Sequence, residues 1–140
     1  MNLEFEVKAG DFTMAGKASS SIKKTLKQLG VDAAVIRRVV VAVYEAEVNI
    51  VAHAYSGKIT ADIDSDGIRV VLADSGPGIP DVEKAMQKGF STASPKVREM
   101  GFGAGMGLPN IKDNADELEI DTEVGKGTTL RIYIKFNNAS

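Results

Sequence analysis

The stretch Leu72-Ala73-Asp74-Ser75-Gly76-Pro77-Gly78-Ile79-Pro80 follows a run of strand-forming residues, 68–72, and ends it with an acid and two glycines. Val, Ile and Leu favour strands, and Gly-Pro-Gly terminates one. We therefore expect Asp74 at the mouth of a strand, where its carboxylate can accept a hydrogen bond from an exocyclic amine such as that of adenine. Gly76 and Gly78 would let the backbone approach a flat ligand where a Cβ would clash. Taken alone, the pattern is also typical of an ordinary strand-end turn.

The composition is that of a globular protein. The 140 residues are 44% hydrophobic and 26% charged, with a net charge of -2, no cysteine and one histidine, His53. This predicts a single domain over residues 1–140. The charge argues against nucleic acid or membrane partners, and the missing cysteines exclude disulfides and thiol catalysis. We find no signal peptide and no apolar run long enough to span a membrane, so we expect a cytoplasmic protein.

Hydrophobic periodicity predicts an alternation of strands and helices. Period-two alternation predicts strands at residues 2–8, 58–63, 68–72, 118–123 and 128–136. Helical patterns cover residues 12–29, 33–55, 81–88 and 108–115. Gly30 is expected to end the first helix and Asp32 to cap the second. The second helix is apolar over much of its circumference, which is typical of a helix that lies against a sheet.

Three polar residues line one face of that helix. Glu45, Asn49 and His53 are spaced by four residues, which places them one above another. Polar side chains on a largely apolar helix need partners, and a wet cleft would supply them. The alternative is a solvated stripe in which Glu45 and Glu47 are ordinary surface acids.

Residues 89–107 form the least regular segment, with five glycines, and a segment this long is usually functional or disordered. It ends as Gly101-Phe102-Gly103-Ala104-Gly105-Met106-Gly107 and leads directly into a helix. Glycine amides at a helix N-terminus are suited to binding phosphate. The alternative is a flexible linker, but a linker would not need four glycines at two-residue spacing. We therefore interpret residues 89–107 as a lid that ends in a phosphate site.

Three motifs thus follow one another: Glu45-x-x-x-Asn49, Asp74-x-Gly76-x-Gly78 and Gly103-x-Gly105-x-Gly107. Together they resemble the N, G1 and G2 boxes of the GHKL, or Bergerat-fold, ATPases, which include gyrases and histidine kinases. The resemblance extends over about residues 35–136. It implies an α/β two-layer sandwich with a mixed, mostly antiparallel sheet that helices cover on one face.

Within this superfamily the chain is most similar to the small serine/threonine kinases of bacterial sigma-factor control, the anti-sigma and RsbT-type switch kinases. The likeness lies in residues 74–81, in Gly89-Phe90-Ser91-Thr92 and in the ending at 123–129. It implies transfer of the ATP γ-phosphoryl group to a hydroxyl on a STAS-like regulatory protein in sigma-factor or stress signalling. A sigma factor or a phosphatase would be a further partner, and the apolar N-terminal strand would allow a homodimer.

The resemblance also implies individual roles. Glu45 would be the general base, Asn49 would hold a magnesium ion on the nucleotide phosphates, and Asp74 would receive the adenine amine. Lys96 or Arg98 would meet the terminal phosphate. The other nucleotide-binding residues would be Gly76, Gly78, Ile79, Gly103, Gly105, Met106, Gly107, Leu108 and Thr128. Thr128 would help to hold Asp74, although a threonine there is also an ordinary strand residue.

Two features of the sequence depart from the family pattern. Residues 93–102 make a longer lid than the switch kinases have, which leaves the partner and the phosphate-binding cation open. Ala52 stands where histidine kinases often have a lysine, and there is no room for a dimerisation helix, so we do not expect a histidine kinase. The alternatives are an ATP-binding regulatory module that controls a partner without phosphoryl transfer, and a plain ATPase. Retention of Glu45 favours the kinase.

Overall fold

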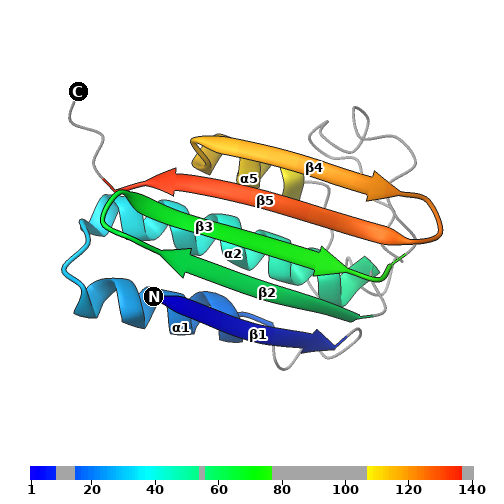
Figure 1. The fold of residues 1–140 in the computed structure, drawn as a ribbon, viewed down its shortest axis with the longest axis horizontal. Helices are drawn as coiled ribbons and strands as arrows, with labels where there is room; N and C mark the ends of the chain where they lie inside the picture. The colour runs from blue at the N-terminus through cyan, green and yellow to red at the C-terminus, as the bar shows by residue number, and fades with distance from the viewer. Residues whose placement is uncertain (9–14, 54–55, 77–106, 137–140) are drawn as a thin grey trace.

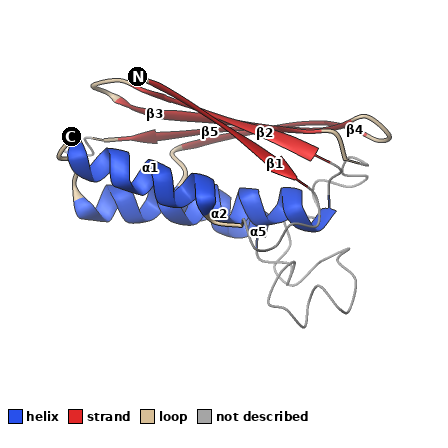
Figure 2. Cartoon of the chain, turned by 90° about the horizontal axis from the view of Figure 1, so that it is seen from below, coloured by secondary structure: helices blue, strands red, loops and turns tan. Residues whose placement is uncertain are grey.

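The computed structural model describes residues 1–8, 15–53, 56–76 and 107–136. These residues form two layers, a five-stranded sheet and a set of helices that all lie on one of its faces (Figures 1 and 2). The strands are β1 (Asn2–Lys8), β2 (Ser56–Ile63), β3 (Gly67–Asp74), β4 (Glu117–Glu123) and β5 (Gly127–Lys135). Their order is β1-β2-β3-β5-β4, and all four described pairings are antiparallel. The expected two-layer α/β sandwich is confirmed.

The described helices are α1 (Lys17–Gln28), α2 (Ala33–His53) and α5 (Gly107–Asn114). None of them is long and apolar enough to cross a membrane. The helix expected at residues 12–29 begins only at Lys17, because Gly16 before it has a left-handed backbone with φ 96°. The helix expected at residues 81–88 lies outside the described residues.

The connection between α1 and α2 has the predicted end signals. Gly30 has φ 77°, its N–H donates to the Lys27 carbonyl at 3.1 Å, and the Val31 N–H donates to the Leu26 carbonyl at 3.1 Å. This pair of bonds is a Schellman motif, which a left-handed glycine makes possible. Asp32 then caps α2, because its Oδ2 accepts the Ala34 N–H at 3.1 Å.

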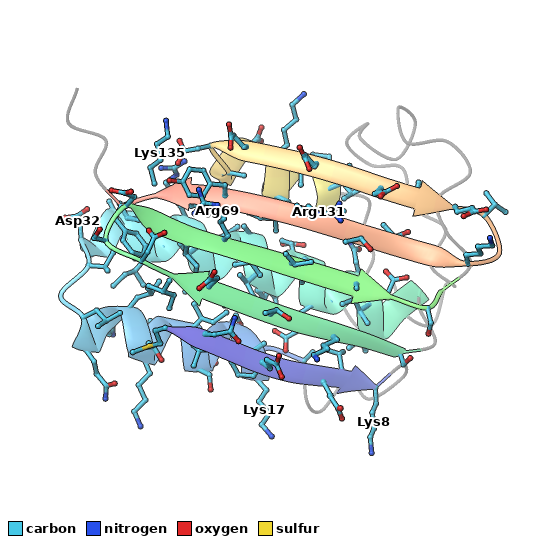
Figure 3. All side chains as sticks on the ribbon, in the orientation of Figure 1. Lys8, Lys17, Asp32, Arg69, Arg131 and Lys135 are labelled. Atoms are coloured by element: carbon cyan, nitrogen blue, oxygen red, sulfur yellow. The ribbon has the colours of Figure 1, made fainter. Side chains whose placement is uncertain are left out.

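The core lies between the sheet and the helices. Alternate residues of each strand face the helices, and α2 lies along the centre of that face between α1 and α5 (Figure 1). The most deeply buried side chains include Ile22, Leu26, Val39, Val43, Ile59, Ile68, Val70, Leu72, Ile111, Ile132 and Ile134. Each such side chain contributes about 1.5–3 kcal/mol of transfer free energy. No described helix covers the opposite face, which carries charged residues such as Arg69, Arg131 and Lys135 (Figure 3).

The contact between α1 and α2 depends on a buried acid. Glu47 of α2 is 2% exposed, and its carboxylate accepts the N–H groups of Ala18 (Oε2, 3.0 Å) and Ser19 (Oε1, 3.4 Å). Gly16 precedes α1 and has no side chain to cap it, so Glu47 satisfies free amides of its first turn. The alternative in which Glu47 is an ordinary surface acid is therefore wrong.

We expect this acid to make stability depend on pH. Burial raises the pKa of the Glu47 carboxyl above its ordinary 4.5, although the amides of Ala18, Ser19 and Gly16 act in the opposite direction. A raised pKa in the folded state means that stability falls as the pH rises from about 4.5 through that pKa. Glu47→Gln should remove this fall, as measured by urea unfolding of both proteins from pH 4 to 8.

Glu47→Ala is the control for the structural role of the side chain. It leaves the Ala18 and Ser19 amides without an acceptor and should lower the free energy of unfolding by about 2 kcal/mol. Parallel pH curves for wild type and Glu47→Gln would show that the carboxyl titrates normally in the folded protein.

Candidate functional site

Asp74 ends β3 with a carboxylate that the backbone holds in place. Its Oδ1 accepts the Gly76 N–H at 2.9 Å and the Thr128 N–H at 3.2 Å. The second bond follows from the register, since Asp74 lies opposite Thr128 in the β3–β5 pairing. No described residue donates to Oδ2. Among the described residues the arrangement thus fixes one oxygen, and the plane of the carboxylate sets the direction of the other.

The turn between β4 and β5 packs tightly against this acid. Gly127 has φ 138°, and a Cβ added to it would overlap the carbonyl oxygen of Asp74. The Thr128 side chain is buried, and its hydroxyl lies 2.9 Å from the hydroxyl of Thr122. Thr128 therefore contacts the Asp74 carboxylate through its backbone N–H, whereas its hydroxyl bonds to the neighbouring strand.

Glu45 and Asn49 lie one turn apart on α2, and both are half-buried. Glu45 Oε1 is 3.3 Å from the side-chain nitrogen of Asn110, which donates to it from α5. Asn110 is not among the residues that the sequence motifs identify. Its only local signal is its place between two buried apolar residues in the first turn after a glycine run, which does not reveal a contact with another helix.

Two kinds of contact fix α5 against α2. Leu108 and Ile111 are buried, at 7% and 0% exposure. At the end of the helix, Arg38 Nε donates to the Asn114 carbonyl at 3.1 Å, and the same guanidinium forms an ion pair with Asp116 at 3.3 Å. Leu108, an expected nucleotide-binding residue, is therefore a core residue in this structure.

The described parts of the three motifs lie on α2, at the end of β3 and at the start of α5. The last residue of β3, the C-terminal end of α2 and the β4–β5 turn lie toward the right-hand end of the sheet in Figure 1, and α5 contacts α2 farther from that end. Glu45, Asn49, Asp74, Gly76 and Gly107 belong to these segments. The expected site residues Gly78, Ile79, Lys96, Arg98, Gly103, Gly105 and Met106, and nearly all of the lid, lie outside the described residues, as does the His53 side chain.

A family model for the histidine kinase-like ATPase domain matches residues 11–134. The chain belongs to this family. The serine/threonine-protein kinase RsbT of Bacillus subtilis is 34% identical over 113 residues, which cover 78% of this chain and 79% of RsbT. The anti-sigma F factor of Clostridium beijerinckii is 32% identical over 146 residues, covering 100% of this chain and 96% of the relative. The anti-sigma F factor of Caldanaerobacter subterraneus subsp. tengcongensis is 42% identical over 96 residues, covering 65% of this chain and 64% of the relative.

Solved structures show the same fold. The RsbU and RsbW domains of Rv1364c from Mycobacterium tuberculosis superpose with a TM-score of 0.64 at 18% identity, covering 96% of this chain and 32% of that one. The mycobacterial sensor histidine kinase MprB superposes with a TM-score of 0.54 at 17% identity, covering 96% of this chain and 97% of that one. The predicted fold is confirmed by these neighbours. The predicted likeness to serine/threonine kinases and anti-sigma factors is confirmed by the sequence relatives, and the family implies use of ATP.

The close approach of Gly127 to Asp74 gives a direct test of the acid's place in a nucleotide site. Gly127→Ala should push the Asp74 backbone away and weaken magnesium-ATP binding by roughly tenfold or more, as measured by calorimetry. Gly125→Ala is the matched control, because Gly125 lies in the same turn with φ 84° but has open space around it. Equal affinity in the two variants would contradict a role for the Asp74 position.

Proposed function

We propose that the chain is an ATP-dependent serine/threonine protein kinase of the anti-sigma or switch type. It would transfer the γ-phosphoryl group to a hydroxyl on a STAS-type regulatory protein, in the cytoplasm, where sigma factors act. The observation that supports this most is the Asp74 carboxylate, anchored through Oδ1 at the end of β3, with Glu45 and Asn49 in the C-terminal half of the helix α2 that lies beneath the sheet. The kinase and anti-sigma factors among the relatives support the substrate class.

Asp74 would bind the adenine. Because Oδ1 already accepts two backbone N–H groups, Oδ2 is directed away from them and can accept the exocyclic amine. A preorganised acceptor loses little freedom on binding. Gly78, Ile79, Gly103, Gly105, Met106 and Gly107 remain proposed contacts to the base and phosphates.

Glu45 would act on the acceptor hydroxyl. The hydroxyl oxygen attacks the γ-phosphorus in line, the bond to the β–γ bridging oxygen breaks, and ADP leaves. The hydroxyl proton passes to the Glu45 carboxylate. The half-buried position of Glu45 reduces competition from bulk water, since part of its surface is covered by α5.

Asn49 would contribute to a magnesium site. Its amide oxygen is a hard donor of the type that magnesium accepts beside phosphate and water, and it lies one turn from Glu45. A magnesium ion held there would neutralise phosphate charge during transfer. Lys96 or Arg98 is the proposed source of further positive charge at the terminal phosphate.

Asp74→Asn should weaken magnesium-ATP binding by roughly 100-fold in calorimetry. The asparagine oxygen can keep the bonds to Gly76 and Thr128, but the other position then carries an NH2 group that faces the adenine amine with a donor. The fold is therefore retained while the acceptor is lost. Thr128→Val is the control, since it keeps the backbone N–H and should bind ATP with nearly wild-type affinity. Unchanged affinity in Asp74→Asn would remove Asp74 from the site.

Glu45→Gln should lower phosphoryl transfer by 100-fold or more but leave ATP affinity unchanged, because the amide cannot accept the proton. The assay measures transfer of ³²P from [γ-³²P]ATP to purified STAS-domain proteins of the organism that encodes this chain. Glu47→Gln, the same change two residues later on α2, should keep the wild-type rate.

The same assay separates the alternatives. Transfer at the wild-type rate by Glu45→Gln would disprove the general-base role. Phosphate release without any partner would indicate an ATPase, and ATP binding with neither reaction would indicate a regulatory module.

A further inference from the structure

One contact joins the proposed catalytic residue to a helix that carries no expected catalytic group. The Asn110 side chain donates to Glu45 Oε1 at 3.3 Å, across the α2–α5 contact. Both residues are half-buried, and they are 65 positions apart in the sequence. The inference below rests on the proposed function, because it concerns how the general base is held.

The position of Asn110 is itself fixed. Its neighbours Leu108 and Ile111 are buried in the core, at 7% and 0% exposure. The bond from Arg38 to the Asn114 carbonyl holds the far end of α5 on α2. A rigid donor orients a carboxylate, whereas a side chain on a mobile segment would not.

We propose that Asn110 is a positioning residue for Glu45. Its amide N–H occupies Oε1, so that the carboxylate is held in one orientation and Oε2 is presented to the acceptor hydroxyl. A neutral amide is suited to this task because it donates a hydrogen bond but cannot take the proton that Glu45 must accept. Asn110 also lies three residues after Gly107, so one short helix connects the end of the expected phosphate-binding segment with the base.

The test is a double-mutant cycle on phosphoryl transfer at saturating magnesium-ATP. Asn110→Ala should lower the transfer rate by roughly tenfold, because a general base that is poorly oriented loses only part of its rate enhancement. Its ATP affinity should stay within about twofold of wild type. In the Glu45→Gln background the same change should have no further effect. Asn110→Asp, which keeps the shape but replaces the donor by a like charge, should lower the rate more than Asn110→Ala.

Asn114→Ala and Asn114→Asp are the matched controls. They make the same substitutions one turn later on α5. Among the described contacts, the Asn114 side chain bonds only to the Asn110 carbonyl. Both should transfer phosphate at nearly the wild-type rate. An unchanged transfer rate in Asn110→Ala would overturn the proposal, and so would an equal loss of rate in the Asn114 variants. It would also be overturned if Asn110→Ala lowered the rate of Glu45→Gln by the same factor as it lowers the rate of wild type.

A second cycle, on stability, needs neither nucleotide nor acceptor. Asn110→Ala should change the unfolding equilibrium constant roughly two- to tenfold more in wild type than in Glu45→Ala, measured by urea unfolding. Additive effects would show that the contact does not form in solution and would overturn the inference alone. If the two stability effects were not additive but Glu45→Gln transferred phosphate at the wild-type rate, the contact would exist but Glu45 would not be the base. The positioning role of Asn110 would then be wrong as well.

Discussion

The packing of α2 on the sheet is the constraint on which the other features depend. Val39, Val43 and Ile50 bury one side of the helix against the strands, and α1 and α5 then pack along its two flanks. This leaves few positions on α2 where a polar side chain can lie. Glu47 is tolerated toward α1 because it receives two amides, and Glu45 is tolerated toward α5 because it receives one.

The acidic end of the site depends on backbone geometry instead of side-chain packing. The β3–β5 register brings the Thr128 amide to Asp74, and the β4–β5 turn approaches so closely that only glycine fits at residue 127. A carboxylate held by main-chain donors keeps its orientation without a charged partner. The two halves of the site are thus stabilised by different means, a core-facing helix for Glu45 and Asn49, and a strand pair for Asp74.

The short helix α5 links these halves to the glycine-rich segment before it. Eight residues that include a proline and two asparagines form a weak helix on their own, and helices of this length are marginal in isolation. Its stability comes from Leu108 and Ile111 in the core and from Arg38 at its end. The position of α5 is therefore set by its contacts with α2 and the core, not by the helix propensity of its own residues.

The sequence by itself determined the features that depend on local physics. Strand alternation, the Gly30 and Asp32 end signals and the spacing of the three motifs reflect the conformational preferences of neighbouring residues, and they predicted the strands, the end of α1, the start of α2 and the family. The late start of α1, the burial of Glu47, the contact of Thr128 with Asp74 through its backbone and the bond from Asn110 to Glu45 were decided only by the tertiary structure. The last three join residues between 28 and 65 positions apart, and no local pattern encodes which helix faces or strands will meet.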